Sequence, residues 1–202
     1  MTELRDLDWD GTDISDEQHD GVQFRDADLT DAESTGASFT NCTFVDCRFG
    51  GSTHNATAFA NCTFISCRFF DATFKDCKLV GSTFQDCTFG SLVVDGGDWS
   101  FVNLRGADLE GAVLTDVRMI DADLTGARCK DARLRRVDLT GSTLHRIDVT
   151  SADLRGSTIT GLDPLAAQVR DAILDPDQTV ALARELGFDV QLAPEPGEPE
   201  DA

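Results

Sequence analysis

The sequence predicts an all-β solenoid built from square coils, and two regularities that run along most of the chain support this prediction. Every fifth residue from Phe24 to Ile159 belongs to one register of 28 positions, and 25 of these hold Phe, Leu, Val, Ile, Met or Trp. Ten of the thirteen Phe residues fall in this register, and a small residue usually stands two positions before each member. An internal repeat of this kind decides the fold before any local signal does.

A period of five fits neither the 3.6 residues of an α-helical turn nor the two-residue alternation of a straight strand. The large residue and the small residue two positions before it would point the same way along a short strand. The next such pair begins three residues later, so the chain must turn between them. The intervening positions are rich in Gly, Asp, Thr and Ser, which favour turns. Each pentapeptide is therefore predicted to be a three-residue strand followed by a corner.

Four corners would close one coil of 20 residues, and the sequence repeats at that distance. The segment 41–49 (NCTFVDCRF) returns at 61–69 as NCTFISCRF. Coils stack through backbone hydrogen bonds at about 4.8 Å per coil, so seven coils over 24–159 would make a rod of roughly 34 Å. Because Leu4, Trp9 and Ile14 share the register, we expect the coils to span residues 1–174, with the large side chains filling the axis.

A helix is predicted after the last coil. Asp175 is a suitable N-cap, Pro176 fits the first helical position, Gln178 completes a capping box, and Gly187 can end the helix. One explanation is that the helix covers the open end of the solenoid, where unpaired edges must be protected. The other is a symmetric dimer interface, because this segment has more apolar surface than a cap requires.

The dimer hypothesis concerns residues 175–193, which would contain the helix and a short alternating strand over 188–192. Beyond them, the Pro- and Glu-rich residues 194–202 are predicted to be a disordered acidic tail. The candidate dimer residues are apolar side chains of the helix and the strand: Val180, Ala183, Leu186, Phe188 and Val190.

Acidic residues dominate the charge of the chain, with 37 Asp and Glu against 17 Lys and Arg and a net charge of −20. This balance argues against direct nucleic-acid binding and favours a basic partner. Within the coils Lys78, Asp98, Arg118 and Asp138 stand 20 residues apart, so we expect them to pair between coils. There is no apolar run long enough to span a bilayer, and the acidic first residues are unlike a secretory signal, so we expect a cytoplasmic protein.

Nothing in the sequence indicates an enzyme, a cofactor or a metal site. The seven Cys occupy inward positions of the repeat and are explained as small buried residues. There is no GxSxG, P-loop or dinucleotide-binding motif. Ser34 and His54 also fall on the inward register of one face, and we expect them to mark a locally irregular or widened coil rather than a catalytic pair.

The segments 107–111 (ADLEG), 122–126 (ADLTG) and 152–156 (ADLRG) resemble the repeat of the pentapeptide repeat proteins. The resemblance implies a right-handed quadrilateral β-helix over about residues 2–174. The helix after the last coil is similar to that of the MfpA proteins of this family and, more distantly, of the Qnr proteins. Qnr proteins have loops that interrupt the coils, whereas the register here never slips between residues 22 and 159, so the MfpA-like form is favoured.

For that branch, the resemblance implies a homodimer that imitates the shape and negative charge of duplex DNA, binds DNA gyrase and protects it from fluoroquinolones. The alternative is a pentapeptide-repeat scaffold with an unassigned protein partner, and a sharper version of the first hypothesis is self-protection in a cell that makes a topoisomerase poison. Candidate contacts with gyrase lie on the second face of the coils, with two on nearby faces: Asp71, Asp108, Glu110, Asp131 and Asp148, then Asp121 and Asp123.

Each of these acids also has a simpler explanation, as a solvated corner residue chosen for turn geometry. Exposed apolar side chains are harder to explain in this way and would mark where a partner packs. We expect them at five corner positions: Val45, Ile65, Phe70, Phe101 and Ile120.

Overall fold

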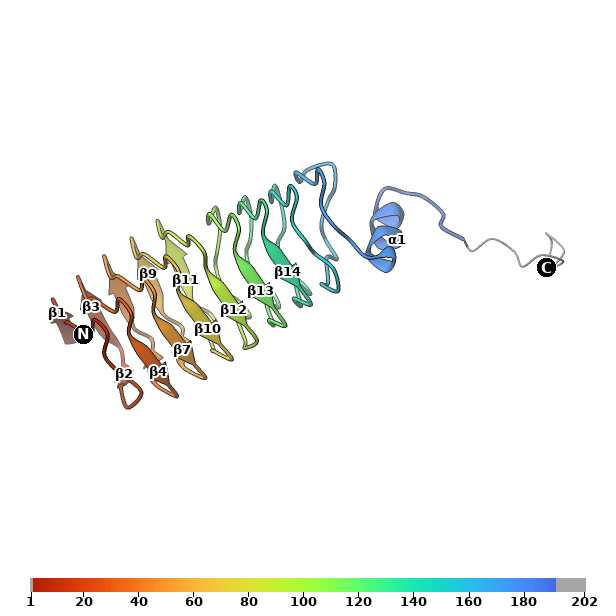
Figure 1. The fold of residues 1–202 in the computed structure, drawn as a ribbon. Helices are drawn as coiled ribbons and strands as arrows, with labels where there is room; N and C mark the ends of the chain where they lie inside the picture. The colour runs from red at the N-terminus through yellow and green to blue at the C-terminus, as the bar shows by residue number, and fades with distance from the viewer. Residues whose placement is uncertain (1, 192–202) are drawn as a thin grey trace, which may run out of the picture.

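The computed structural model describes residues 2–191, which form a rod of stacked coils with one helix at its C-terminal end (Figure 1). All strand pairs are parallel and join residues 20 positions apart, as in Phe44 opposite Phe64. The predicted β-solenoid is therefore confirmed. The expected disordered tail over 194–202 lies outside the described residues.

The coils have four faces, which we number in chain order. The first face contains β1 (Thr2–Arg5), β3 (Val22–Arg25), β6 (Thr43–Val45), β9 (Thr63–Ile65) and β11 (Thr83–Gln85). The second face is joined by isolated bridges, among them Asp28 with Arg48 and Arg128 with Asp148. The third face contains β4 (Glu33–Thr35), β7 (Thr53–Asn55), β10 (Thr73–Lys75), β12 (Val93–Asp95), β13 (Val113–Thr115) and β14 (Arg133–Arg135). The fourth contains β2 (Gln18–Asp20), β5 (Ser38–Thr40) and β8 (Ala58–Ala60).

Both ends of the repeat join the stack. Strand β1 pairs along its length with β3, and after the last full coil Gln168 and Ile173 bridge to Asp148 and Asp153. Helix α1 (Pro176–Glu185) begins directly afterwards, with both hydrogen bonds of the predicted capping box between Asp175 and Gln178. The helix is too short and too polar to cross a lipid bilayer, and it is the one helix among residues 2–191.

A left-handed backbone conformation recurs at the corners. In almost every pentapeptide the residue two positions after the large inward side chain has a φ between about +46° and +89°. Gly, Asp and Asn tolerate this conformation best, and they occupy most of these positions. The corner composition noted in the sequence therefore has a backbone cause.

The core is a stack of the inward side chains. On the first face the rings of Phe24, Phe44, Phe64 and Phe84 lie almost parallel, with successive centroids 4.8, 5.0 and 4.8 Å apart. All four are buried, and Leu104, Leu124 and Leu144 continue the row. The filled axis explains why apolar residues recur at every fifth position.

Ser34 and His54 do not mark an irregular coil, which corrects the expectation from the sequence. They pair in register between β4 and β7, and both side chains are buried. The Ser34 hydroxyl lies 2.7 Å from His54 Nδ1 and 2.7 Å from the Thr57 hydroxyl, while His54 Nε2 lies 3.1 Å from the Ser52 hydroxyl. Hydrogen bonds satisfy these polar groups, so the coil stays regular.

Two further expectations differ from the structure. Val45, which pairs with Arg25 and Ile65 of the neighbouring coils, is buried rather than exposed, and Ile65 and Ile120 are half-buried. The described part of the predicted strand over 188–192, residues 188–191, forms no strand. An isolated strand has no partner for its backbone groups, and alternation alone does not supply one.

Candidate functional site

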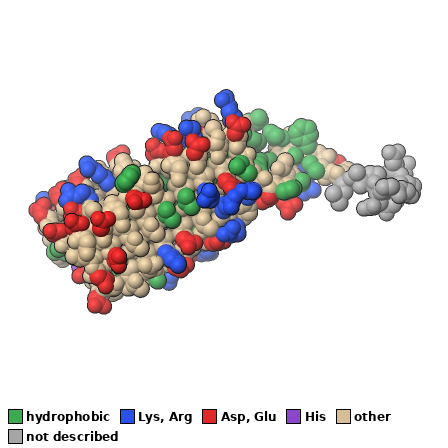
Figure 2. Space-filling view, viewed as in Figure 1, with side chains coloured by type: hydrophobic (Ala, Val, Ile, Leu, Met, Phe, Trp, Pro, Cys, Tyr) green, Lys and Arg blue, Asp and Glu red, His purple; other side chains and the backbone are tan. Residues whose placement is uncertain are grey.

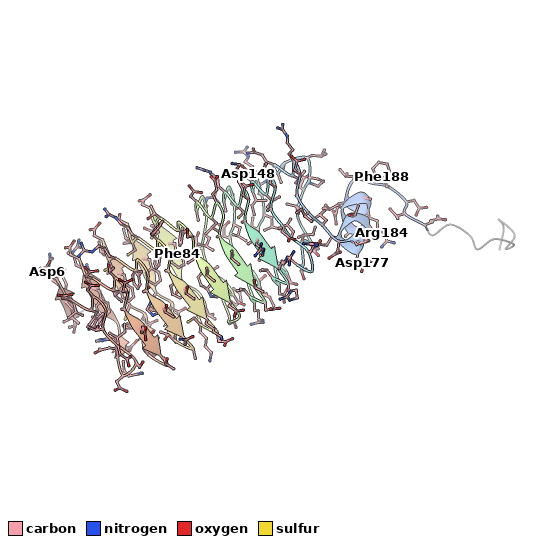
Figure 3. The ribbon with its side chains drawn as sticks, in the orientation of Figure 1. Asp6, Phe84, Asp148, Asp177, Arg184 and Phe188 are labelled. Atoms are coloured by element: carbon pink, nitrogen blue, oxygen red, sulfur yellow. The ribbon has the colours of Figure 1, made fainter. Side chains whose placement is uncertain are left out.

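Of the five acids predicted on the second face, Asp108, Glu110 and Asp148 lie there and Asp71 and Asp131 lie at the corner that follows it, but their surroundings are not purely acidic. Arg128 stands between Asp108 and Asp148 in the ladder of bridges on this face. Its guanidinium lies 3.4 Å from Asp108 and 3.0 Å from Glu110, and Lys130 Nζ lies 3.3 Å from Glu110. The face is therefore mixed in charge near the helical end of the rod, where Figure 3 labels Asp148.

These cations lower the charge available to a partner. The Lys130 ammonium and the Arg128 guanidinium lower the pKa of Glu110. Lys130 also lies 3.3 Å from Asp131, whose own backbone is left-handed (φ 56°). Asp71 has the same left-handed corner conformation (φ 58°) and is exposed two coils away from Glu110.

Turn hydrogen bonds account for several of the other candidate acids. Asp148 accepts a hydrogen bond from the Thr150 amide at 2.9 Å, and Asp123 accepts one from the Thr125 amide at 2.9 Å. Partial burial tends to raise the pKa of both carboxyls, but the side chains and amides of Thr150 and Thr125, together with nearby cations, outweigh it and the pKa values are lowered. The acids thus stabilise corners while they remain charged.

Asp121 and Asp123 lie away from the second face, as expected. Asp121 is exposed at the corner between the fourth and first faces, with φ 54°. Asp123 belongs to the first face, where Arg105 lies 3.6 Å away. The structure therefore brings five of the seven candidates to the second face and the corner that follows it, and places the other two on or beside the first face.

Of the predicted ladder on the fourth face, one ion pair between coils is present among the described residues, that of Asp98 with Arg118. The backbones of Lys78, Asp98, Arg118 and Asp138 bridge in succession, and Arg118 lies 2.9 Å from Asp98. Similar pairs join Asp28 to Arg48 at 2.6 Å and Arg136 to Asp116. The Arg48 guanidinium lowers the pKa of Asp28 to about 2. Charges 20 residues apart therefore stabilise the stack.

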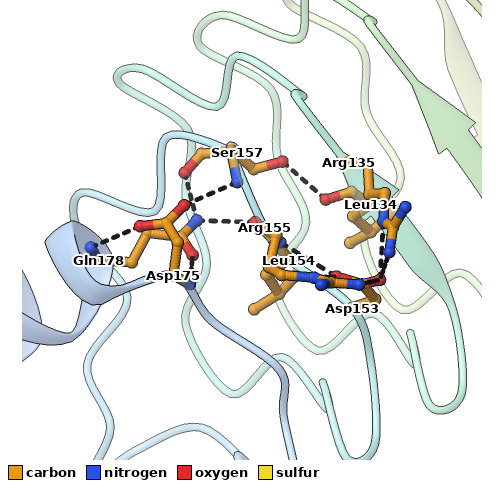
Figure 4. Close-up of polar contacts among 9 residues, drawn as sticks. Leu134, Arg135, Asp153, Leu154, Arg155, Ser157, Asp175 and Gln178 are labelled. Atoms are coloured by element: carbon orange, nitrogen blue, oxygen red, sulfur yellow. Dashed lines mark hydrogen bonds and ion pairs between the residues drawn. The ribbon is translucent and has the colours of Figure 1, made fainter.

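Helix α1 is attached to the rod by apolar contacts and by the polar contacts that Figure 4 shows. The Gln178 amide donates two hydrogen bonds of 2.7 Å, to the Leu154 and Ser157 carbonyls, and Asp175 accepts one from the Gly156 amide at 2.9 Å. Leu182 packs against the core beside them. Gln178 was predicted only as a capping residue, and its role in docking the helix could not be read from the local sequence.

The candidate dimer residues lie around this attached helix. Val180, Ala183 and Val190 are half-buried, whereas Leu186 is 45% exposed and Phe188 is 64% exposed. Leu165, which the sequence did not single out, is 84% exposed and lines a surface depression of about 440 Å³ together with Leu186. Figure 2 shows hydrophobic side chains gathered over this end of the rod.

The inward polar groups offer no accessible site. Burial lowers the pKa of His54 to about 3, so the ring is neutral at ordinary pH. Burial also raises the pKa of Cys77 to about 11 and that of Cys129 to about 12. Among residues 2–191 there is no group of three or more His, Cys, Asp and Glu side chains that could hold a metal ion. The chemistry available to a partner is therefore that of the outer faces.

Comparison with solved structures finds rods of the same kind. A trypsin-treated variant of QnrB1, described as a plasmid-mediated fluoroquinolone resistance protein, is 20% identical with a TM-score of 0.74, and the match covers 94% of this chain and all of that chain. A second trypsin-treated variant is also 20% identical, with a TM-score of 0.54 over 93% of this chain and 99% of that chain. At this identity the likeness shows the fold alone.

Family models match the repeats directly. A model described as a pentapeptide repeat region matches residues 37–114, and a model of eight pentapeptide repeats matches 20–53, 118–156 and 132–163. The search of curated proteins found no matching relative. The two models together cover most of the coils, and the chain therefore belongs to the pentapeptide repeat family.

Proposed function

We propose that this protein binds DNA gyrase as a mimic of duplex DNA and protects the enzyme from fluoroquinolones or similar topoisomerase poisons. The main support is the form of the molecule, a slender rod with a filled axis and a net charge of −20. A rod of this kind can present its charge only on its outer faces. The similar solved structures are those of QnrB1, described as a fluoroquinolone resistance protein, which agrees with the proposal.

The N-terminal coils would supply much of the negative charge that gyrase meets. Asp6, Asp8, Asp10 and Asp26 line one surface depression of about 320 Å³ there, with Arg48 as its one base. Figure 3 labels Asp6 at this end. Clustered carboxylates raise the local concentration of a basic partner and accelerate association. We include the second-face acids in the contact surface, but their nearby cations make them weaker contributors.

Within this proposal two rods pair through the C-terminal helices to form a homodimer. The exposed side chains of Leu186, Phe188 and Leu165 supply apolar surface that a second copy would cover. A two-fold pairing at this end would place the acidic N-terminal coils at both outer ends of a rod of doubled length. The uninterrupted register favours the MfpA-like form over the Qnr-like form.

The proposed mechanism is binding without catalysis and needs no cofactor. Gyrase acts on chromosomal DNA, so the protein would work in the cytoplasm. Charge repulsion and the acidic faces would keep it from binding nucleic acid itself. In the self-protection version of the proposal, the cell that makes a topoisomerase poison uses the protein to shield its own gyrase.

The second candidate function is a scaffold with a different protein partner. The ion pairs of Arg128 and Lys130 with Asp108 and Glu110 favour it, because paired charges imitate a phosphate backbone poorly. This candidate keeps the filled rod and the dimer but requires no basic DNA-binding surface on the partner.

An assay of supercoiling by purified gyrase distinguishes the gyrase proposal from the scaffold candidate. Relaxed plasmid, gyrase and ATP are incubated with increasing amounts of the protein, with and without a fluoroquinolone, at two salt concentrations. The gyrase proposal predicts altered supercoiling or fewer drug-stabilised cleavage products, with an effect that weakens as salt rises because the contacts are ionic. No effect in any condition leaves the scaffold candidate.

A further inference from the structure

Phe101 combines backbone strain with exposure. Its φ is 60°, and it is the one large apolar residue among the non-glycine residues with positive φ in the described part of the chain. Its side chain is 59% exposed. A bulky residue in the left-handed region is unfavourable, and an exposed ring gains little from burial to offset the strain.

The fold does not require Phe at this position. Phe101 occupies the corner between the fourth and first faces, and in the other coils the same place is filled by residues that suit the left-handed backbone: Gly21, Asn41, Asn61, Gly81, Asp121, Gly141 and Gly161. The free rod would therefore be at least as stable with Asn or Gly at residue 101. The side chain needs an explanation outside the folding of the rod.

Apolar residues also stand beside this corner in the coils before and after Phe101. The Phe101 amide donates a hydrogen bond of 2.8 Å to the Ile120 carbonyl in the next coil. Val80 lies one coil earlier, directly before Gly81, whose amide donates to the Ser100 carbonyl at 3.0 Å. Val80 and Ile120 are half-buried.

The same pentapeptide contains two other departures from the repeat. Gly97 has φ 90°, and a Cβ there would lie 2.2 Å from the Cys77 carbonyl oxygen. The inward side chain that follows, Trp99, is the last aromatic in the core, and its buried Nε1 has no hydrogen-bond partner among residues 2–191. Local exceptions to a regular pattern are expected to gather at functional sites.

Phe70 is the other exposed aromatic side chain of the coils, at 65%, but its setting is different. It lies on the second face with no positive φ, and its ring lies against Gly90 of the next coil, where an added Cβ would come within 2.9 Å of the ring. Phe70 is therefore unstrained and supported by the rod. It offers a matched comparison for Phe101.

Charge indicates the kind of partner. Asp121 follows Phe101 at the same corner one coil later, is exposed, and makes no ion pair with any described residue. We propose that Phe101 anchors the partner-binding surface by inserting its ring into an apolar pocket of a protein partner, beside a Lys or Arg that pairs with Asp121. The inference rests on the proposed function where it takes gyrase as that partner.

An anchor of this kind has a distinct energetic signature. A buried aromatic residue at the centre of an interface often accounts for a large part of the affinity, whereas exposed rim charges mainly affect the association rate. Replacing the ring should therefore raise the dissociation rate. The relative loss should be similar at low and high salt, because apolar contacts are not screened.

The test compares the full-length protein with Phe101→Asn and Phe70→Thr in binding to immobilised purified gyrase at two salt concentrations. Asn fills the position of residue 101 in two other coils, and Thr30 and Thr150 occupy the place of Phe70. We expect Phe101→Asn to melt at the same or a higher temperature and to bind about 30-fold more weakly. We expect Phe70→Thr to bind as the wild type does.

The outcomes separate the inference from the proposed function. Wild-type protein that fails to bind gyrase refutes the proposed function and, with it, the anchor. Wild-type binding with an unchanged affinity for Phe101→Asn refutes the anchor alone, as does a loss confined to Phe70→Thr. If the Phe101→Asn variant binds gyrase more weakly and also melts at a lower temperature than the wild type, Phe101 has a structural role and the proposal is contradicted.

Discussion

Replacing His54 by Phe should make the rod more resistant to acid. Burial lowers the pKa of His54 from its ordinary value of 6.5 to about 3. Below pH 6.5 the unfolded chain takes up a proton at this residue, whereas the folded rod does not until the pH approaches 3. The stability that depends on the neutral ring is therefore complete above pH 6.5 and is lost as the pH falls toward 3.

The size of the effect follows from that pKa difference. Over the whole range the loss is about 5 kcal/mol of unfolding free energy, and at pH 4.5 it is about 3 kcal/mol. Phe at residue 54 can stack on Phe74, whose ring lies 5.1 Å from the imidazole. The Ser34 hydroxyl keeps its contact with Thr57, and the Ser52 hydroxyl keeps its bond to a backbone carbonyl, so few polar groups lose their partners.

The assay is urea unfolding followed by far-ultraviolet circular dichroism at pH 7 and at pH 4.5. The wild type should lose about 3 kcal/mol more than His54→Phe between the two conditions. Carboxylates titrate equally in both proteins, so the difference isolates the imidazole. His145→Asn, which removes an exposed corner histidine, is the control and should behave as the wild type does. Equal acid sensitivity in wild type and His54→Phe would refute the reasoning.

Three further predictions concern the core and the helical end. Phe64→Asp places an unpaired charge between rings 5.0 and 4.8 Å away and should cost more than about 4 kcal/mol, so an unchanged melting curve would contradict the filled axis. Gln178→Ala removes two 2.7 Å hydrogen bonds and should cost about 1–3 kcal/mol locally. Hydrogen exchange should then quicken in helix α1 while the coils keep their protection; equal rates in both proteins would contradict that anchoring role. Val180→Asp combined with Leu186→Asp should halve the mass measured by light scattering, and a wild type that is already monomeric would refute the dimer.

The solenoid could be predicted from sequence because burial acts on every repeat in the same way. Phe64 and Leu124 differ in shape, but both occupy the inward register, and 20 residues always return the chain to the same face. The left-handed corners reinforce this pattern through Asp, Asn and Gly. Each local preference therefore agrees with the global fold, which is the condition for a reliable prediction.

The features that were missed depend on contacts between coils. Ser34 looked out of place because its two partners, His54 and Thr57, belong to the next coil, and only Ser52, the second partner of His54, is close in sequence. The neutralising ion pairs were within reach of the sequence, since Lys130 and Glu110 stand 20 residues apart, as Asp98 and Arg118 of the fourth face do. The docking of Gln178 on the rod could not be predicted from the sequence, because its partners are backbone carbonyls, which every residue type has.

The most direct test of the central claim is competition between the protein and DNA for gyrase. Fluorescently labelled duplex DNA is bound to purified gyrase, and its anisotropy is followed as the protein is added at low salt. The account predicts full release of the DNA, with an apparent affinity that falls as the labelled DNA concentration is raised. A rod that binds gyrase while the DNA stays bound would contradict the claim that its outer faces take the place of the duplex.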